Sequence, residues 1–152
     1  MKSKQQYSPL NILLVDDDKD DCIFFDTTLK KLSHPTHLTT VHDGEELMSY
    51  LSKNSNRLPD VIFLDLNMPR KNGFECLVEI KENEKLKDLN VIMFSTSIPQ
   101  DKNYEREMIA SLFKIGAIYF IRKSSDFNLL KQDIDDSLKK VIEKIRSINK
   151  NR

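Results

Sequence analysis

The sequence predicts an α/β domain with a doubly wound, five-stranded parallel sheet and five helices on its two faces. Three observations support this prediction. Short apolar runs alternate with longer stretches whose apolar residues recur every three or four positions, as in amphipathic helices. Several of the runs are continuously apolar, which is typical of strands buried on both faces. The 152 residues include only three glycines, which disfavours an all-β protein with many tight turns.

The elements follow one another in a regular order. The five expected strands are Asn11–Val15, His37–Val41, Val61–Leu64, Val91–Phe94 and Ala117–Arg122. The five expected helices span about 18–32, 43–51, 74–80, 104–113 and 127–148. Asp43 is expected to cap the second helix, with Glu46 three residues later as in a capping box. Gly116 fits the position that follows the last residue of the fourth helix.

Composition limits the functional classes. Lys and Arg number 24 and so do Asp and Glu, and this zero net charge disfavours both disorder and general nucleic-acid binding. No apolar run approaches the ~20 residues of a membrane span, and the polar start lacks a signal-peptide core, so a cytoplasmic setting is expected. Cys22 and Cys76 form no metal-binding pair and are expected to be free thiols on helices.

The length favours one domain over residues 1–152, with a core at about 10–149 and a polar extension at 1–9. No output domain is expected. Residues 131–152 carry seven basic and four acidic side chains. A DNA-binding role for this tail stays possible, but its apolar stripe favours a helix that packs on the domain.

Polar residues follow four of the five strands. The strand ends read Asp16-Asp17-Asp18, Asp65-Leu66-Asn67, Ser95-Thr96-Ser97 and Arg122-Lys123. In open parallel sheets the functional crevice lies at the carboxyl ends of the strands, so these groups are expected to converge. Single acidic residues here have a simpler interpretation: Asp18 fits a helix cap, and Asp20, Asp21 and Asp26 fit a solvated helix surface. The histidines His34, His37 and His42 are expected to lie away from this edge, on the surface or in loops.

Three carboxylates in one crevice need positive charge. Each pair among Asp16, Asp17 and Asp65 would cost about 4 kcal/mol at ~4 Å and an effective dielectric near 20. Lys123 supplies one positive charge, and a hard cation such as Mg²⁺ would supply more. A metal and a lysine beside a carboxylate nucleophile suit phosphoryl transfer. The sequence has no glycine-rich phosphate loop and no G-x-S-x-G nucleophile turn that would indicate another chemistry.

These residues resemble the receiver domain of bacterial response regulators in two-component signalling. The resemblance is carried by four segments: Ile12–Asp18, Phe63–Gly73 with its D-L-N-M-P-x-x-x-G pattern, Met93–Ser95 and Gly116–Lys123. It covers nearly the whole chain and implies a flavodoxin-like fold with strand order 2-1-3-4-5. The D-L-N-M-P-R sequence and a long loop from Lys81 to Leu89 are similar to the corresponding segments of receivers paired with phytochrome-type kinases.

The resemblance implies a role for each site residue. Asp65 would be the phosphoacceptor, and Ser95 and Lys123 would contact the phosphoryl group. Asp16, Asp17, Asp65 and the carbonyl group of Asn67 would hold Mg²⁺. Ser95 and Phe120 would form the switch that remodels the face of the fourth helix, fifth strand and fifth helix.

The implied partners are a sensor histidine kinase or a histidine phosphotransfer protein, a downstream protein and, through the switch face, a second copy. Neither nucleic acid nor membrane is expected as a partner, and the protein is expected to assist its own phosphorylation and dephosphorylation rather than act as an enzyme. The sequence departs from the family where Ser124 replaces the usual proline after Lys123, and where Thr96 replaces a small residue. Asn67 and Ser97 occupy positions that tune phosphoryl lifetime.

Two other functions stay open. A phosphohydrolase of the haloacid-dehalogenase type also uses an aspartate nucleophile and Mg²⁺, but it would need a second aspartate where Asn67 stands. A receiver-like binding module that works without phosphorylation is the second alternative.

Overall fold

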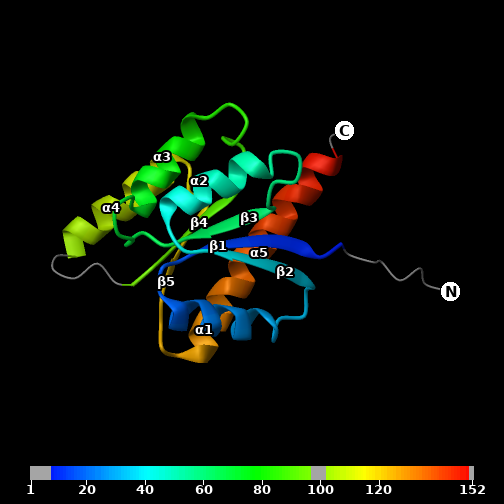
Figure 1. The fold of residues 1–152 in the computed structure, drawn as a ribbon. Coiled ribbons are helices and arrows are strands. Elements are labelled where there is room, and N and C mark those ends of the chain that lie inside the picture. The colour runs from blue at the N-terminus through cyan, green and yellow to red at the C-terminus, as the bar shows by residue number, and fades with distance from the viewer. Residues whose placement is uncertain (1–7, 97–101, 151–152) are drawn as a thin grey trace.

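The computed structural model describes residues 8–96 and 102–150. Five strands and five helices alternate along the chain (Figure 1). The strands are β1 (Leu10–Val15), β2 (Thr36–Val41), β3 (Val61–Leu64), β4 (Val91–Ser95) and β5 (Tyr119–Arg122). The helices are α1 (Lys19–Leu29), α2 (Gly44–Lys53), α3 (Gly73–Glu82), α4 (Lys102–Ile115) and α5 (Phe127–Lys150).

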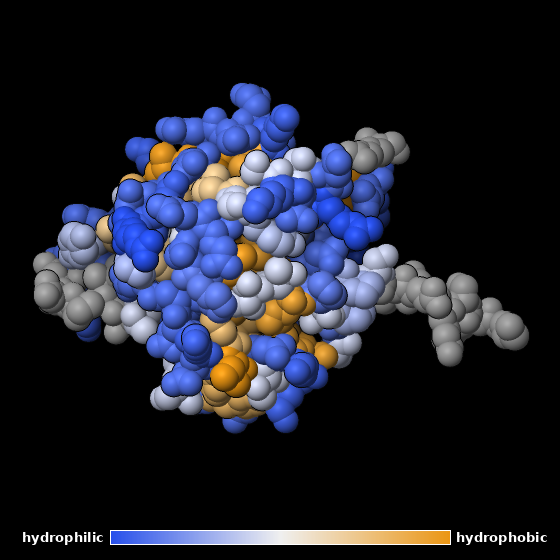
Figure 2. Space-filling model, viewed as in Figure 1, coloured by the Kyte–Doolittle hydropathy of each residue, from blue (hydrophilic) through white to orange (hydrophobic). Residues whose placement is uncertain are grey.

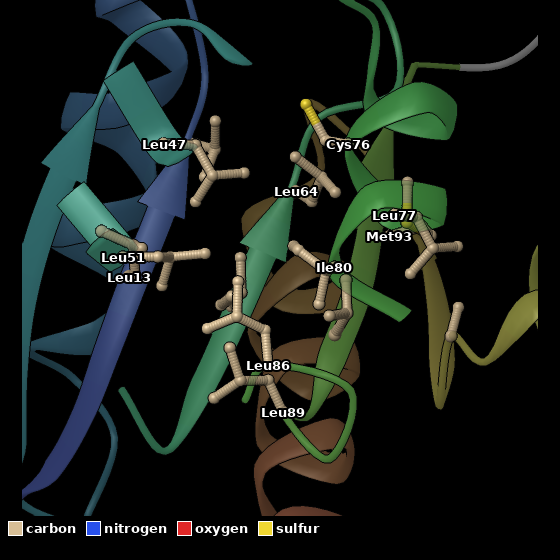
Figure 3. Close-up of a cluster of buried hydrophobic side chains, with 14 of the residues drawn as sticks. Leu13, Leu47, Leu51, Leu64, Cys76, Leu77, Ile80, Leu86, Leu89 and Met93 are labelled. Carbon is tan, nitrogen blue, oxygen red and sulfur yellow. The ribbon is translucent and has the colours of Figure 1, made fainter. Parts of the chain in front are cut away.

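All strand pairs are parallel, and the sheet order is β2-β1-β3-β4-β5, which confirms the expected fold. Helices α2, α3 and α4 cover one face, and α1 and α5 cover the other (Figure 1). Each face has its own hydrophobic cluster. The first includes Leu13, Leu64 and Leu77, drawn in Figure 3, and the second centres on Phe25, Phe63 and Phe94. Strands β1, β3 and β4 contribute side chains to both clusters, because successive side chains of a strand point to opposite faces of the sheet.

Element boundaries differ from expectation by a few residues. Asp18 is the N-cap of α1 as expected, and its carboxylate accepts a hydrogen bond from the Asp21 amide, but the helix ends at Leu29 rather than at about residue 32. Asp43 caps α2 as expected, but the carboxylate of Glu46 accepts from the His42 amide rather than from Asp43 itself. β5 begins two residues later than expected, at Tyr119.

Two predicted loop features have definite outcomes. Gly116 has φ +137°, a conformation that side chains rarely adopt, and it follows α4 as predicted. The loop expected at Lys81–Leu89 begins only after Glu82, where α3 ends.

The face in Figure 2 is largely hydrophilic, with isolated hydrophobic patches in the region of α1 and β2. None of the helices within the described residues is long and apolar enough to cross a membrane.

Candidate phosphoryl-transfer site

The backbone of the sheet places Asp16 and Asp65 side by side. The Asp16 amide donates to the carbonyl of Val41, and the Asp65 amide donates to the carbonyl of Val15. Each aspartate therefore continues the parallel ladder one residue beyond its strand. Both side chains end up buried, with Asp16 fully inaccessible and Asp65 only 3% exposed.

Asp17 completes a cluster of three carboxylates. One carboxylate oxygen from each of Asp16, Asp17 and Asp65 lies within 4.8 Å of the others. Asp17 is exposed, so the cluster opens to solvent on its side. Oxygen ligands at this spacing, two of them buried, suit a hard divalent cation. These donors thus fit a hard divalent cation, the class of metal that the sequence predicted.

Lys123 lies over the cluster at the end of β5. Its Nζ is 2.7 Å from Asp16 Oδ2 and 3.4 Å from Asp65 Oδ2, so the expected compensating charge is present. Its amide also donates to the carbonyl of Ser95 at 2.7 Å, which ties the ends of β4 and β5 together. Burial alone would lower the pKa of Lys123, but the ion pairs with the aspartates outweigh it and raise the pKa.

Asp65 has an unusual protonation equilibrium. The pKa of its carboxyl group is raised to about 7, mainly by burial and also by the nearby Asp16. Lys123 and the Asn67 amide, which donates to Asp65 Oδ1 at 3.1 Å, act in the opposite direction. Burial beside another carboxylate destabilises the charged form of Asp65, so a bound cation would stabilise it.

Ser95 and Asn67 are joined by a hydrogen bond beside the carboxylate cluster. Ser95 is fully buried at the end of β4, and its Oγ accepts a hydrogen bond from Asn67 Nδ2 at 3.2 Å. Thr96, the next residue, is exposed. Phe120 is half-buried and packs on the cluster between the sheet and α2, α3 and α4. Ser97 lies outside the described residues.

A close helix approach fixes the loop after Asp65. A Cβ built on Gly73, the first residue of α3, would lie 2.2 Å from the carbonyl oxygen of Asp65. Only glycine allows this contact, so Gly73 brings the start of α3 directly against the Asp65 backbone. Within the described residues, Arg70 is the one non-glycine residue with positive φ, at 66°. The same loop therefore also contains a strained residue.

Two expectations about this edge need correction, and the peptide bond at which Ser124 replaces the family's usual proline has a definite geometry. Asp21 is not merely solvated, because its carboxylate contacts Lys123 Nζ at 2.9 Å. His42 is exposed as expected but does not lie away from the site, since its Nδ1 is 3.1 Å from the carbonyl oxygen of Asp16. The described residues contain no cis peptide bond, so the Lys123–Ser124 bond is trans.

Comparison with known proteins places this geometry in a family. A family model of the response regulator receiver domain matches residues 12–135. Response regulator Rcp1 of Synechocystis is 38% identical over 104 residues, which are 65% of this chain and 70% of that protein. The crystal structure of the phosphorylated cyanobacterial phytochrome response regulator RcpA has 35% identity and a TM-score of 0.70, covering 82% of this chain and 88% of that one.

A third comparison concerns the metal. The structure of Rcp1 in its manganese-bound form has 30% identity and a TM-score of 0.68, again covering 82% of this chain and 88% of that one. Together with the three-carboxylate cluster, this likeness supports a divalent metal at this edge. The similarity to phytochrome response regulators agrees with the expected subgroup. The chain belongs to the response regulator receiver family, the phosphoacceptor domains of two-component signalling.

Proposed function

We propose that Asp65 is the phosphoacceptor of this receiver. The observation that carries the proposal is the position of its carboxylate, which is buried and lies beside Lys123, Asp16 and Asp17 at one sheet edge. A carboxylate oxygen of Asp65 attacks the phosphorus of a phosphohistidine. The new P–O bond forms as the P–N bond breaks, and the histidine nitrogen leaves with the electron pair of that bond.

Mg²⁺ is the metal that we propose for this site. The carboxylates of Asp16, Asp17 and Asp65 would hold it together with the carbonyl group of Asn67. When bound, it supplies positive charge to the carboxylates and to the phosphoryl oxygens. Lys123 stays charged and stabilises negative charge on the transferring group. The Ser95 hydroxyl accepts from Asn67 Nδ2, so its own O–H remains free to donate to the same group.

Phosphorylation would be transmitted through Ser95 and Phe120. A phosphoryl group on Asp65 adds charge that attracts the Ser95 hydroxyl and the Lys123 ammonium group. We propose that Phe120 then turns toward the space near Ser95 and remodels the face of α4, β5 and α5. The Arg122–Glu105 ion pair joins β5 to α4 on this face. A movement of one of these two elements would therefore displace the other or break the ion pair.

Receiver domains exchange phosphoryl groups with histidine kinases or phosphotransfer proteins and act on downstream targets. For this chain we propose a sensor kinase or phosphotransfer protein as the donor, with a downstream protein or a second copy at the α4–β5–α5 face. We also propose that the pocket promotes hydrolysis of its own acyl phosphate. Cys22 and Cys76 are free thiols, which supports the reducing cytoplasm as the place of this exchange.

The test is phosphorylation by acetyl phosphate, followed by intact-protein mass spectrometry. The wild-type protein should gain one phosphoryl group in the presence of Mg²⁺ and none with a chelator, and Asp65→Asn should gain none. Full labelling of Asp65→Asn would show that another residue is the acceptor. A wild-type protein that stays unlabelled would instead favour the phosphorylation-independent binding module. Turnover of a simple phosphomonoester would favour the phosphohydrolase, although Asn67 cannot act as its general acid.

A further inference from the structure

The ammonium group of Lys123 is shared by three carboxylates. Its Nζ lies 2.7 Å from Asp16, 2.9 Å from Asp21 and 3.4 Å from Asp65. Of the three contacts only the one with Asp21 has hydrogen-bond geometry, whereas Asp16 Oδ2 accepts no hydrogen bond and its contact with Lys123 is an ion pair. The contact with Asp65 is the longest of the three. It is also the contact that a phosphoryl group on Asp65 would replace, whereas the two shorter contacts need not change.

Asp21 reaches Lys123 from a different direction than the other two carboxylates. Asp16 and Asp65 follow strands of the sheet, but Asp21 lies in the first turn of α1, which Figure 1 shows beside the end of β5. Its side chain is 37% exposed, whereas that of Lys123 is only 10% exposed. The hydrogen bond from Lys123 Nζ to Asp21 Oδ2 therefore holds the ammonium group from the α1 side.

Lys123 has free space into which it could move. A cavity of about 440 Å³ adjoins it on the α1 side, where Phe24, Thr96 and Ser124 contribute to the lining. A lysine head sits on a flexible four-carbon stem and is not held by its own geometry. Without Asp21, the one short contact that remains is the one with Asp16. The ammonium group could then rotate about that contact and leave its place beside Asp65.

We propose that Asp21 is a positioning residue for phosphoryl transfer. Its hydrogen bond to Lys123 and the ion pair between Lys123 and Asp16 hold the ammonium group at two points, so that the positive charge stays beside the Asp65 oxygen where the phosphoryl group forms. This inference rests on the proposed role of Asp65 and adds a residue from α1 to the site. The opposite possibility is that Asp21 competes with the phosphoryl group for Lys123, and the two predict opposite rate changes.

The experiment compares phosphorylation rates of three variants at saturating acetyl phosphate and Mg²⁺. Asp21→Ala should react about 3- to 10-fold more slowly, as for loss of one hydrogen bond in the transition state. Asp21→Asn should stay close to wild type because its amide oxygen can still accept from Lys123. Asp20→Ala removes a neighbouring exposed acid from the same helical turn and should have no effect. Faster reaction of both Asp21 variants would show competition, and unchanged rates in both would show that Asp21 has no role.

A double-mutant cycle tests whether Asp21 acts through Lys123. In a Lys123→Met background, Asp21→Ala should cause no additional slowing, because the group that it positions is gone. Independent, multiplicative effects of the two substitutions would contradict the proposal. The Kd for Mg²⁺ should be the same in Asp21→Ala as in wild type, since Asp21 is not one of the three clustered carboxylates.

A second measurement needs no phosphorylation. Acetic anhydride labelling followed by peptide mapping reports how accessible the Lys123 amine is. Asp21→Ala should acetylate Lys123 faster than wild type, whereas Asp21→Asn and Asp20→Ala should not. Equal labelling of Lys123 in wild type and the three variants would by itself refute the proposal that Asp21 anchors Lys123. A wild-type protein that resists acetyl phosphate but protects Lys123 in this way would refute the proposed acceptor and leave the anchoring intact.

Discussion

Strand β3 has an aspartate at each end, and the two residues have opposite surroundings. Asp60 precedes the strand, is half-buried, and accepts a hydrogen bond from the Asn11 amide at 2.7 Å. Asp65 follows the strand, is almost fully buried, and shares its pocket with two carboxylates and a lysine. Asp60 thus joins neighbouring strands, whereas Asp65 has a raised pKa and a cation beside it. The same side chain becomes structural or reactive according to the sheet edge on which it lies.

The largest expected effect is on phosphorylation. Asp65→Asn should reduce labelling by acetyl phosphate to background, whereas Asp60→Asn should be labelled to the same extent as wild type. Both substitutions exchange a carboxylate for an amide next to the same strand, so each is the control for the other. The measurement is intact mass after reaction with acetyl phosphate and Mg²⁺. Loss of labelling in Asp60→Asn but not in Asp65→Asn would show that the phosphoacceptor is Asp60, at the opposite end of β3.

Metal binding should differ between the two edges as well. Asp17→Asn removes one of the clustered carboxylates and should weaken Mg²⁺ binding at least about 10-fold, since even groups outside the coordination shell often matter that much. Asp60→Asn should leave the affinity unchanged. Isothermal titration calorimetry measures both values. Equal affinities of Asp17→Asn and wild type would contradict the proposed ligand set.

The affinity for Mg²⁺ should also depend on pH. Because burial raises the pKa of Asp65 to about 7, the metal-free carboxyl group must lose a proton before it can bind a cation. Affinity in the wild type should therefore fall as pH decreases from 8 to 6, by up to about 10-fold per unit. Asp65→Asn should bind more weakly but lose most of this dependence. The same pH slope in both proteins would exclude Asp65 as the titrating group.

A smaller effect is expected on the stability of the metal-free protein. Between the unfolded pKa near 4 and the folded pKa near 7, the native state binds more protons than the unfolded chain, so stability from this group is lost as pH rises. At pH 8, the free energy of unfolding of Asp65→Asn should therefore exceed that of wild type by about 1–3 kcal/mol. The gain should shrink toward pH 5. Asp60→Asn should instead lose about 1 kcal/mol at both pH values, as for one hydrogen bond.

These stabilities can be measured by urea denaturation in the presence of a chelator. A decrease in stability for Asp65→Asn at pH 8 would show that the ion pair with Lys123 outweighs the cost of burying the charge.

The smallest expected effect concerns the loop after β3. Arg70 has φ 66°, and the Lys71 amide donates to the carbonyl of Pro69 across it, which forms a strained γ-turn. Arg70→Gly should raise the free energy of unfolding by about 0.5 kcal/mol, the difference between relief of strain and the added chain entropy of glycine. Lower stability of the glycine variant would show that the arginine side chain contributes more than its backbone costs.

The sequence predicted the fold and most of this edge for a definite reason. Parallel strands buried on both faces are uninterrupted apolar runs, and polar residues directly after them must lie at one edge. Asp16, Asp65 and Lys123 could therefore be placed together without coordinates. The boundary of β5 was less certain because Ala117 and Ile118 continue its apolar run although neither belongs to the strand.

Asp21 and His42 were missed because their roles depend on three-dimensional reach. Asp21 has the appearance of an ordinary acidic residue in the first turn of a helix, where such residues are common. Only the path of the Lys123 side chain brings the two together. One signal was present, since the first turn of α1 must start at the same edge as Asp16. The positive φ of Arg70 had no sequence signal, because the residue there is neither glycine nor asparagine.

The most direct test of the central claim is a crystal structure with beryllofluoride and Mg²⁺. Beryllofluoride adds to a carboxylate and resembles the phosphoryl group. We predict that it binds to an oxygen of Asp65, within hydrogen-bonding distance of Lys123 Nζ and Ser95 Oγ, and that Asp60 remains bonded to the Asn11 amide. Beryllofluoride on any other aspartate, or an unmodified Asp65 in crystals saturated with both reagents, would contradict the account.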